Sequence, residues 1–117
     1  MYSPGQVADK TGFSLDTLRY YERIGLLDGI ARTPGGRRTF TDEDLGWLEV
    51  LRCLRDTGMP IAHMQRYADL CRTGEATFAE RIDLLEEHDR AVQEQIGLLR
   101  AQQQHIRDKI KYYRSRS

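Results

Sequence analysis

The stretch SPGQVADKTGFSLDTLRYYERIGLL, residues 3–27, contains two short helical patterns separated by one glycine. Ser3 stands before a proline, as an N-cap does before the first turn of a helix. Gly12 is expected to end this helix, because glycine readily takes the left-handed conformation that closes a helix. Ser14 is then the expected N-cap of a second helix. This order predicts a helix-turn-helix over residues 3–25.

The second helix is expected to have two different faces. At about 100° per residue, one side is apolar and the opposite side is basic and aromatic. The apolar side holds Leu15, Leu18 and Tyr21, and the opposite side holds Arg19, Tyr20 and Arg23. The basic side suits a surface that grips phosphates. A solvated charged face with an incidental tyrosine is the alternative interpretation.

A basic hairpin is predicted directly after this helix. The segment DGIARTPGGRRTF, residues 28–40, contains the turn signal Thr33-Pro34-Gly35-Gly36 between two short strands. Arg32, Arg37 and Arg38 flank the turn. An ordinary surface hairpin is one reading. A basic hairpin that follows a helix-turn-helix is a wing, however, and the combination indicates DNA binding.

Two more helices are expected over residues 41–74. Thr41 caps the first, Gly58 ends it, and Gly74 ends the second. The residues expected to pack inward are Trp47, Val50, Leu51, Leu54, Ile61, Met64, Ala68 and Cys71. Residues 1–75 would therefore form one winged helix-turn-helix head.

A long helix is predicted over residues 77–113, followed by a short tail at 114–117. Thr77 and Glu80 are the expected capping box. A heptad seam runs along the helix, and its expected dimerisation residues are Ile82, Leu85, Val92, Ile96, Leu99, Ile106 and Ile110. At about 1.5 Å per residue the helix is roughly 54 Å long, more than the small head can cover. We therefore expect a homodimer formed through a two-stranded coiled coil.

Composition excludes several other classes of protein. The formal net charge is zero, with a small basic excess within residues 1–40. No apolar run is long enough to cross a membrane, and no signal peptide is visible. The two cysteines are not spaced as a disulfide framework or a zinc site. We expect a cytoplasmic protein without a metal or cofactor. We do not expect an enzyme, because a nucleophilic cysteine needs an adjacent base and the nearest histidine, His63, lies on the following helix.

The order of these elements resembles the MerR family of transcription regulators over essentially the whole chain. The specific segments are TLRYYERIGLL at 17–27, GGRRTF at 35–40 and LRCLRDTGMPI at 51–61. The resemblance implies a mostly α-helical fold and a homodimer bound to promoters whose spacer is overlong. It also implies that the regulator bends and untwists the DNA for RNA polymerase, so that deformation of the DNA is the regulated quantity.

The resemblance also assigns roles to individual residues. The residues expected to contact DNA are Arg19, Tyr20, Arg23, Arg37, Arg38 and Arg55. Those of the second helix would lie in or beside the major groove, and the wing arginines and Arg55 would hold backbone phosphates. Many family wings carry an aromatic residue where this chain has Gly36.

The segment LRCLRDTGMPI is similar to the NmlR/AdhR-like branch of the family, whose cysteine at this position is associated with reactive aldehydes, other electrophiles and thiol stress. Cys53 is the matching residue. It lies off the apolar stripe of its helix, whereas Cys71 fits the apolar spacing of its own. A cysteine buried under the partner's coiled coil is the alternative for Cys53.

Other interpretations of the whole chain remain open. One is a MerR-type regulator with another signal, such as a small molecule or a metal. Another is a DNA-bending protein of the excisionase kind that senses nothing. Drug-responsive family members carry an additional C-terminal effector domain, and we expect it to be missing because the sequence ends at YYRSRS.

Overall fold

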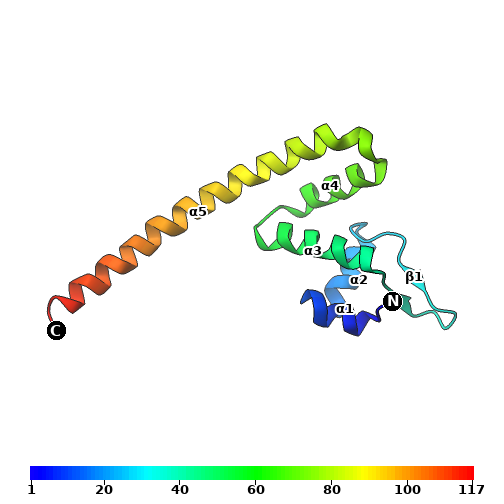
Figure 1. The fold of residues 1–117 in the computed structure, drawn as a ribbon, viewed down its shortest axis with the longest axis horizontal. Coiled ribbons are helices and arrows are strands. Elements are labelled where there is room, and N and C mark those ends of the chain that lie inside the picture. Colours follow the sequence, from blue (N-terminus) through cyan, green and yellow to red (C-terminus); the bar gives the residue numbers. More distant parts are fainter. The chain divides into compact units, whose positions relative to one another are not determined.

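Five α-helices, one short 3-10 turn and one two-stranded hairpin make up the computed structural model, which describes all 117 residues (Figure 1). In chain order the elements are α1 (Pro4–Thr11), α2 (Leu15–Arg23), β1 (Ala31–Arg32), β2 (Arg38–Thr39), α3 (Asp42–Asp56), α4 (Ile61–Thr73), η1 (Glu75–Thr77) and α5 (Phe78–Arg114). The chain forms two compact units, Met1–Arg81 and Ile82–Ser117. This mostly helical fold with a single hairpin is the class that the sequence predicts.

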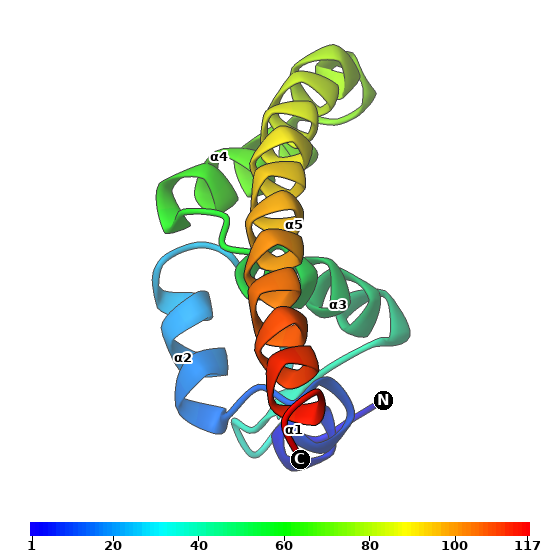
Figure 2. The same ribbon diagram turned by 90° about the vertical axis from the view of Figure 1, so that its left-hand side faces the viewer.

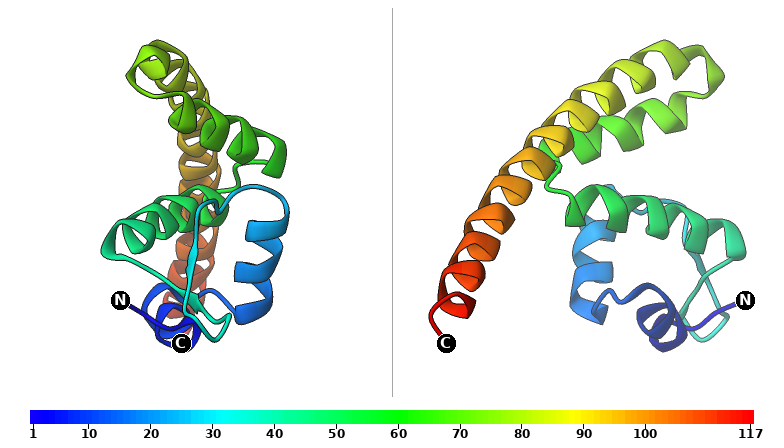
Figure 3. Two further views of the ribbon diagram at one scale, coloured as in Figure 1. Left: turned by 90° about the vertical axis from the view of Figure 1, so that its right-hand side faces the viewer. Right: turned by 60° about the vertical axis from the view of Figure 1, so that its left-hand side comes forward.

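Local hydrogen bonds fix the ends of α1 and α2. Ser3 and Gln6 form a reciprocal capping box, in which each side chain accepts a hydrogen bond from the other's backbone N–H. Gly12 closes α1 in the left-handed region, at φ +79°. The Ser14 hydroxyl oxygen accepts from the backbone N–H of Thr17 at the start of α2. The predicted helix, glycine turn and helix are confirmed, and Figure 3 shows the two helices at a steep angle to one another.

The hairpin is short and is anchored at its base. Its antiparallel register places Ala31 opposite Thr39 and Arg32 opposite Arg38. Directly after β2, the buried Phe40 exchanges two backbone hydrogen bonds with Tyr2, of 2.8 and 2.9 Å. The base of the hairpin is therefore tied to the N-terminal segment, whereas the rest of it extends from the core.

One hydrophobic core holds the first unit together. The buried residues are Val7, Phe13, Leu18, Tyr21, Leu26, Leu27, Phe40, Leu48, Leu51, Leu54, Met59, Met64 and Ala68. They come from every helix of the unit up to α4. The third helix, α3, lies between α1 and α4 and contacts both (Figure 3), so it is the central element of the head.

Three predicted core positions are wrong. Val50 is 39% exposed, and Leu48 is buried in its place. Residues two apart lie about 200° apart around a helix, so Val50 cannot share the face of Leu48. Leu15 and Ile61 are exposed as well. Each is the first residue of its helix, where the first turn extends beyond the packed core.

Side chains of α3 and α4 donate hydrogen bonds to the backbone carbonyls just after α2. Trp47 Nε1 donates to the carbonyl of Leu26 at 2.8 Å, Gln65 Nε2 donates to Ile24 at 3.1 Å, and Arg72 donates to Gly25. Trp47 also stacks on Tyr67 of α4, with ring centroids 5.8 Å apart and planes at 12°. The end of the helix-turn-helix is therefore held by residues from much later in the chain.

The junction before α5 differs from the predicted capping box. Thr77 is buried, and its hydroxyl donates to the carbonyls of Leu70 and Gly74 at 2.6 and 2.9 Å. The same hydroxyl oxygen accepts from Nε of Arg81 at 3.0 Å. The 3-10 turn places Thr77 beside carbonyl groups at the end of α4 that lack a donor within their helix. The Thr77 hydroxyl therefore bonds to these carbonyls and does not form the predicted capping box with Glu80.

The long helix α5 runs without interruption (Figure 2). Most of the predicted seam residues are exposed on it, with Leu99 at 65% and Ile106 at 60%. None of the helices combines the length and the apolar composition needed to cross a membrane.

Candidate nucleic-acid interface

The outward face of α2 carries the predicted basic and aromatic residues. Arg19 is exposed and lies 3.4 Å from the carboxylate of Asp16. The guanidinium of Arg23 lies over the ring of Tyr20, 5.3 Å from its centroid. On the opposite side Tyr21 is buried, and burial raises the pKa of its phenol. The helix is thus anchored by one face and presents an arginine–tyrosine surface on the other.

The tip of the hairpin presents one arginine without an ionic partner. The backbone N–H of Gly36, at φ +83°, donates to the carbonyl of Thr33 at 2.9 Å and closes the turn. The Thr33 hydroxyl oxygen accepts from the backbone N–H of Arg37 at 3.2 Å. The Arg37 side chain is exposed and forms no salt bridge. This geometry leaves its guanidinium available to an anion.

The other two hairpin arginines are paired with Glu22 of α2. Arg38 Nε donates to one carboxylate oxygen at 2.5 Å, and Arg32 Nη2 lies 3.5 Å from the other. Arg32 also donates to the carbonyl of Gly36 at 3.0 Å. Arg38, predicted as a phosphate contact, is therefore engaged inside the protein. Sequence reasoning did not identify Glu22, although an acidic residue on the helix with the basic face was a visible signal.

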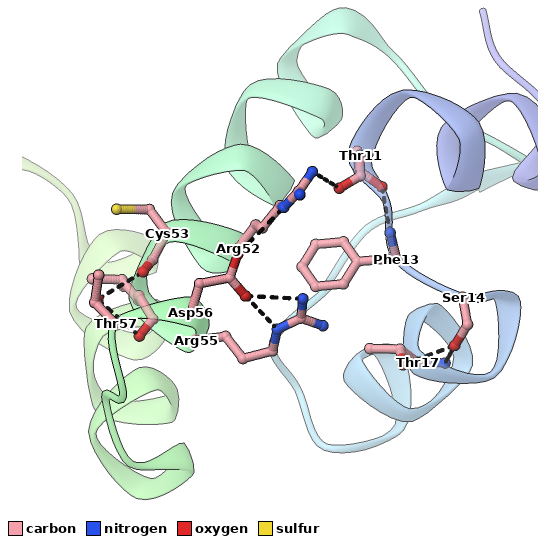
Figure 4. A network of polar contacts seen from close by, with 10 residues as sticks. Thr11, Phe13, Ser14, Thr17, Arg52, Cys53, Arg55, Asp56 and Thr57 are labelled. Carbon is pink, nitrogen blue, oxygen red and sulfur yellow. Dashed lines mark hydrogen bonds and ion pairs between the residues drawn. The ribbon is translucent and has the colours of Figure 1, made fainter. Parts of the chain in front are cut away.

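Arg55 is also engaged inside the protein (Figure 4). Its guanidinium lies over the ring of Phe13, 4.6 Å from the centroid, and makes two hydrogen bonds to Asp56, of 3.0 and 3.1 Å. The hydrogen bonds from Arg55 hold the pKa of the Asp56 carboxyl below its usual value. Arg52 bonds to the same carboxylate at 3.4 Å and donates to the carbonyl of Thr11 at 2.5 Å.

These contacts join the last turns of α3 to the turn between α1 and α2. We call Arg52, Arg55 and Asp56 the α3 polar cluster. Of the six predicted contact residues, five are exposed: Arg19, Tyr20, Arg23, Arg37 and Arg55. Arg38 is only partly exposed and is paired with Glu22 of α2.

Cys53 is exposed on α3, beside the α3 polar cluster. Its carbonyl accepts hydrogen bonds from the hydroxyl and the backbone N–H of Thr57, at 2.7 and 3.1 Å. The thiol points away from the cluster (Figure 4). Cys71 is half-buried on α4. Nowhere in the chain do three or more histidine, cysteine or acidic side chains gather as a metal site would require.

A winged helix-turn-helix with a basic, aromatic face on its second helix is the architecture of a DNA-binding transcription regulator. Residues 2–71 match the family described as MerR HTH family regulatory protein. An uncharacterized HTH-type transcriptional regulator of Haemophilus influenzae is 38% identical over 112 residues, which cover 96% of this chain and 83% of that protein. The chain belongs to the MerR family of transcription regulators.

Two further relatives fall in the same class. The HTH-type transcriptional regulator AdhR of Bacillus subtilis is 38% identical over 80 residues, which cover 68% of this chain and 57% of AdhR. The crystal structure of HiNmlR, a MerR family regulator lacking the sensor domain and bound to promoter DNA, superposes with a TM-score of 0.87 at 37% identity. That match covers 97% of this chain and 90% of HiNmlR. These relatives are regulators of transcription rather than enzymes.

Proposed function

We propose that this MerR-type regulator binds promoter DNA as a homodimer and is switched by reactive aldehydes or other electrophiles at Cys53. In this proposal Arg19, Tyr20 and Arg23 lie at the major groove, and Arg37 holds a backbone phosphate. The dimer distorts a promoter with an overlong spacer, and the modified form brings the promoter into the shape that RNA polymerase uses.

The homodimer is supported by the seam and by the charge pattern of α5. The seam leaves large aliphatic side chains such as Leu99 and Ile106 exposed on a single protomer. The acidic residues gather toward the start of the helix: Glu80, Asp83, Glu86, Glu87, Asp89 and Glu94. Basic residues predominate toward its end, where Arg107, Lys109, Lys111 and Arg114 flank Asp108, although Arg81 and Arg90 lie among the acidic residues near its start. Antiparallel pairing of two copies would bury the seam and set opposite charges beside each other.

The sensing role of Cys53 is supported by its position. The thiol is exposed, so an electrophile in solution can reach it. It lies on the helix whose Arg52 and Arg55 contact the helix-turn-helix. HiNmlR is a regulator lacking the sensor domain, and this chain spans 90% of it. Of the two thiols in this chain, Cys53 is the more exposed.

The covalent step is the addition of a thiolate to an aldehyde. The sulfur of Cys53 forms a bond to the carbonyl carbon, the π electrons move to the oxygen, and the oxygen takes up a proton from water to give a hemithioacetal. The adduct adds volume and a hydroxyl where α3 ends. Because the thiol is exposed and points away from the α3 polar cluster, in this proposal the added group acts where the partner's long helix packs over α3 in the dimer, and such a contact does not accept added volume without a shift. A preference of about 1–3 kcal/mol for one dimer shape is enough for a switch.

The experiment is in-vitro transcription with purified RNA polymerase, with and without formaldehyde. The template is a promoter fragment that the protein retains from a genomic library. Cys53→Ser is expected to keep promoter affinity within a few fold and to lose induction. Cys71→Ser is the matched control and is expected to remain inducible. Full induction of the Cys53→Ser protein would refute the sensor assignment. A wild-type protein that formaldehyde does not induce would refute aldehyde sensing and favour the two alternatives, a regulator with another signal or a DNA-bending protein without a sensor.

A further inference from the structure

Glu22 places a negative charge on the helix that carries the basic and aromatic face. Its neighbours in the sequence are Tyr21 and Arg23, and its side chain is only 28% exposed. A carboxylate this close to a surface that binds phosphates lowers the affinity for every DNA sequence alike. Its contacts therefore have to provide something that outweighs this loss.

One carboxylate joins both strands of the wing to α2. Its Oε2 accepts from Arg38 Nε on β2 at 2.5 Å, and its Oε1 lies 3.5 Å from Arg32 Nη2 on β1. Arg38 is 27% exposed, so the shorter pair is largely shielded from water. Such a charge-assisted bond is stronger than an exposed surface pair.

The hairpin is anchored at its base by Phe40 and Tyr2, and Glu22 adds a contact from both strands to α2. Each strand has only two residues, and an isolated two-stranded hairpin is at best marginally stable in water. Arg32 and Arg38 also stand directly opposite each other in the register, where like charges repel. Glu22 neutralises that repulsion and fixes the direction in which the hairpin leaves the core.

We propose that Glu22 limits the affinity of the protein for DNA of any sequence by holding Arg32 and Arg38 away from the phosphates. With both arginines paired, the wing offers only Arg37 to DNA. Two additional mobile guanidinium groups would strengthen binding to the promoter and to any other sequence alike. The proposal rests on the wing lying at the DNA, as in the proposed function.

The test compares Glu22→Gln with Glu49→Gln. Glutamine keeps the size of the side chain and removes the charge that retains the arginines. Glu49 is an exposed residue of α3 that forms no salt bridge, so its variant makes the same change in net charge. Affinity is measured for a promoter fragment and for a random duplex of equal length, each over a series of salt concentrations.

Glu22→Gln is expected to bind both the random duplex and the promoter fragment about 3- to 10-fold more tightly at low salt. Its plot of log affinity against log salt should steepen by about one unit for each arginine that reaches a phosphate. Glu49→Gln is expected to match the wild type on both duplexes. If Glu22→Gln behaves like Glu49→Gln on the random duplex, the proposal is overturned.

A second variant identifies the source of the gain. Adding Arg32→Ala and Arg38→Ala to Glu22→Gln should return random-duplex binding to the wild-type value. A gain that persists in this triple variant would contradict the proposal, because the extra affinity would not come from these arginines. Arg37→Ala tests the proposed wing contact independently of Glu22. If the slope of log affinity against log salt is unchanged in this variant, the wing does not contact DNA and the proposed wing contact is refuted.

Discussion

Replacing Gly12 with alanine is expected to destabilise the head by about 2–3 kcal/mol. Gly12 has φ +79°, a conformation that costs an L-residue roughly 1–2 kcal/mol. A Cβ atom at this position would stand 2.9 Å from Nη1 and 3.2 Å from Cζ of Arg52. The guanidinium has to move, and its hydrogen bond to the carbonyl of Thr11 is lost. For a half-exposed side chain that bond is worth about 0.5–1.5 kcal/mol.

The assay is thermal unfolding followed by far-ultraviolet circular dichroism at one fixed protein concentration, because dimer stability depends on concentration. In a head of this size a loss of 2–3 kcal/mol corresponds to a fall in Tm of roughly 8–20 °C. Gly46→Ala is the matched control. Gly46 lies inside α3 with nothing within 4 Å of its added Cβ, so alanine there should stabilise the protein by about 0.5–1 kcal/mol.

A double-mutant cycle separates the two contributions at Gly12. In an Arg52→Ala background the collision is absent, and Gly12→Ala should cost only the backbone strain of roughly 1–2 kcal/mol. An equal cost in both backgrounds would show that Arg52 yields without losing its bond. A cost below about 0.5 kcal/mol in the wild-type background would refute the reasoning altogether.

Three further predictions concern the wing, the dimer and the core. Arg37→Ala should lower the salt slope of DNA binding by about one unit per lost phosphate contact, whereas Arg38→Ala should leave the slope unchanged and loosen the wing; equal losses in both would contradict the pairing of Arg38. Leu99→Asp should give a monomer or an unfolded chain by analytical ultracentrifugation, since an unpaired buried charge costs several kcal/mol, roughly; a dimer that melts like the wild type would exclude the seam. Trp47→Phe should lower the free energy of unfolding, measured by urea titration, by about 1–3 kcal/mol, because the carbonyl of Leu26 loses its hydrogen-bond donor.

Features that depend on neighbouring residues were predictable from the sequence. The caps at Ser3, Ser14 and Thr41 and the left-handed Gly12 have partners within four residues, so residue type and spacing are enough to locate them. The single exception is Thr77. Its partners include the carbonyl of a residue seven positions earlier, which a capping rule restricted to one turn does not consider.

The sequence did not reveal which of the candidate arginines have partners within the head, because these charges meet across the fold. Residue type marks an arginine as a candidate for phosphate, but whether it is available depends on its folded neighbours. Arg38 is paired with Glu22, which lies 16 positions earlier, and Arg55 lies over Phe13. Helical periodicity did distinguish the exposed Tyr20 from the buried Tyr21 correctly, because that difference depends only on the geometry of one helix.

The bond from Arg52 to the carbonyl of Thr11 also bears on how the protein is made. The helices expected to read DNA are the first to leave the ribosome, yet the carbonyl that ends α1 finds its donor 41 residues later. The carbonyl of Ile24 is likewise bonded by Gln65, which also lies 41 residues later in the chain. A nascent chain therefore carries an unfinished helix-turn-helix until α3 and α4 have emerged from the ribosome.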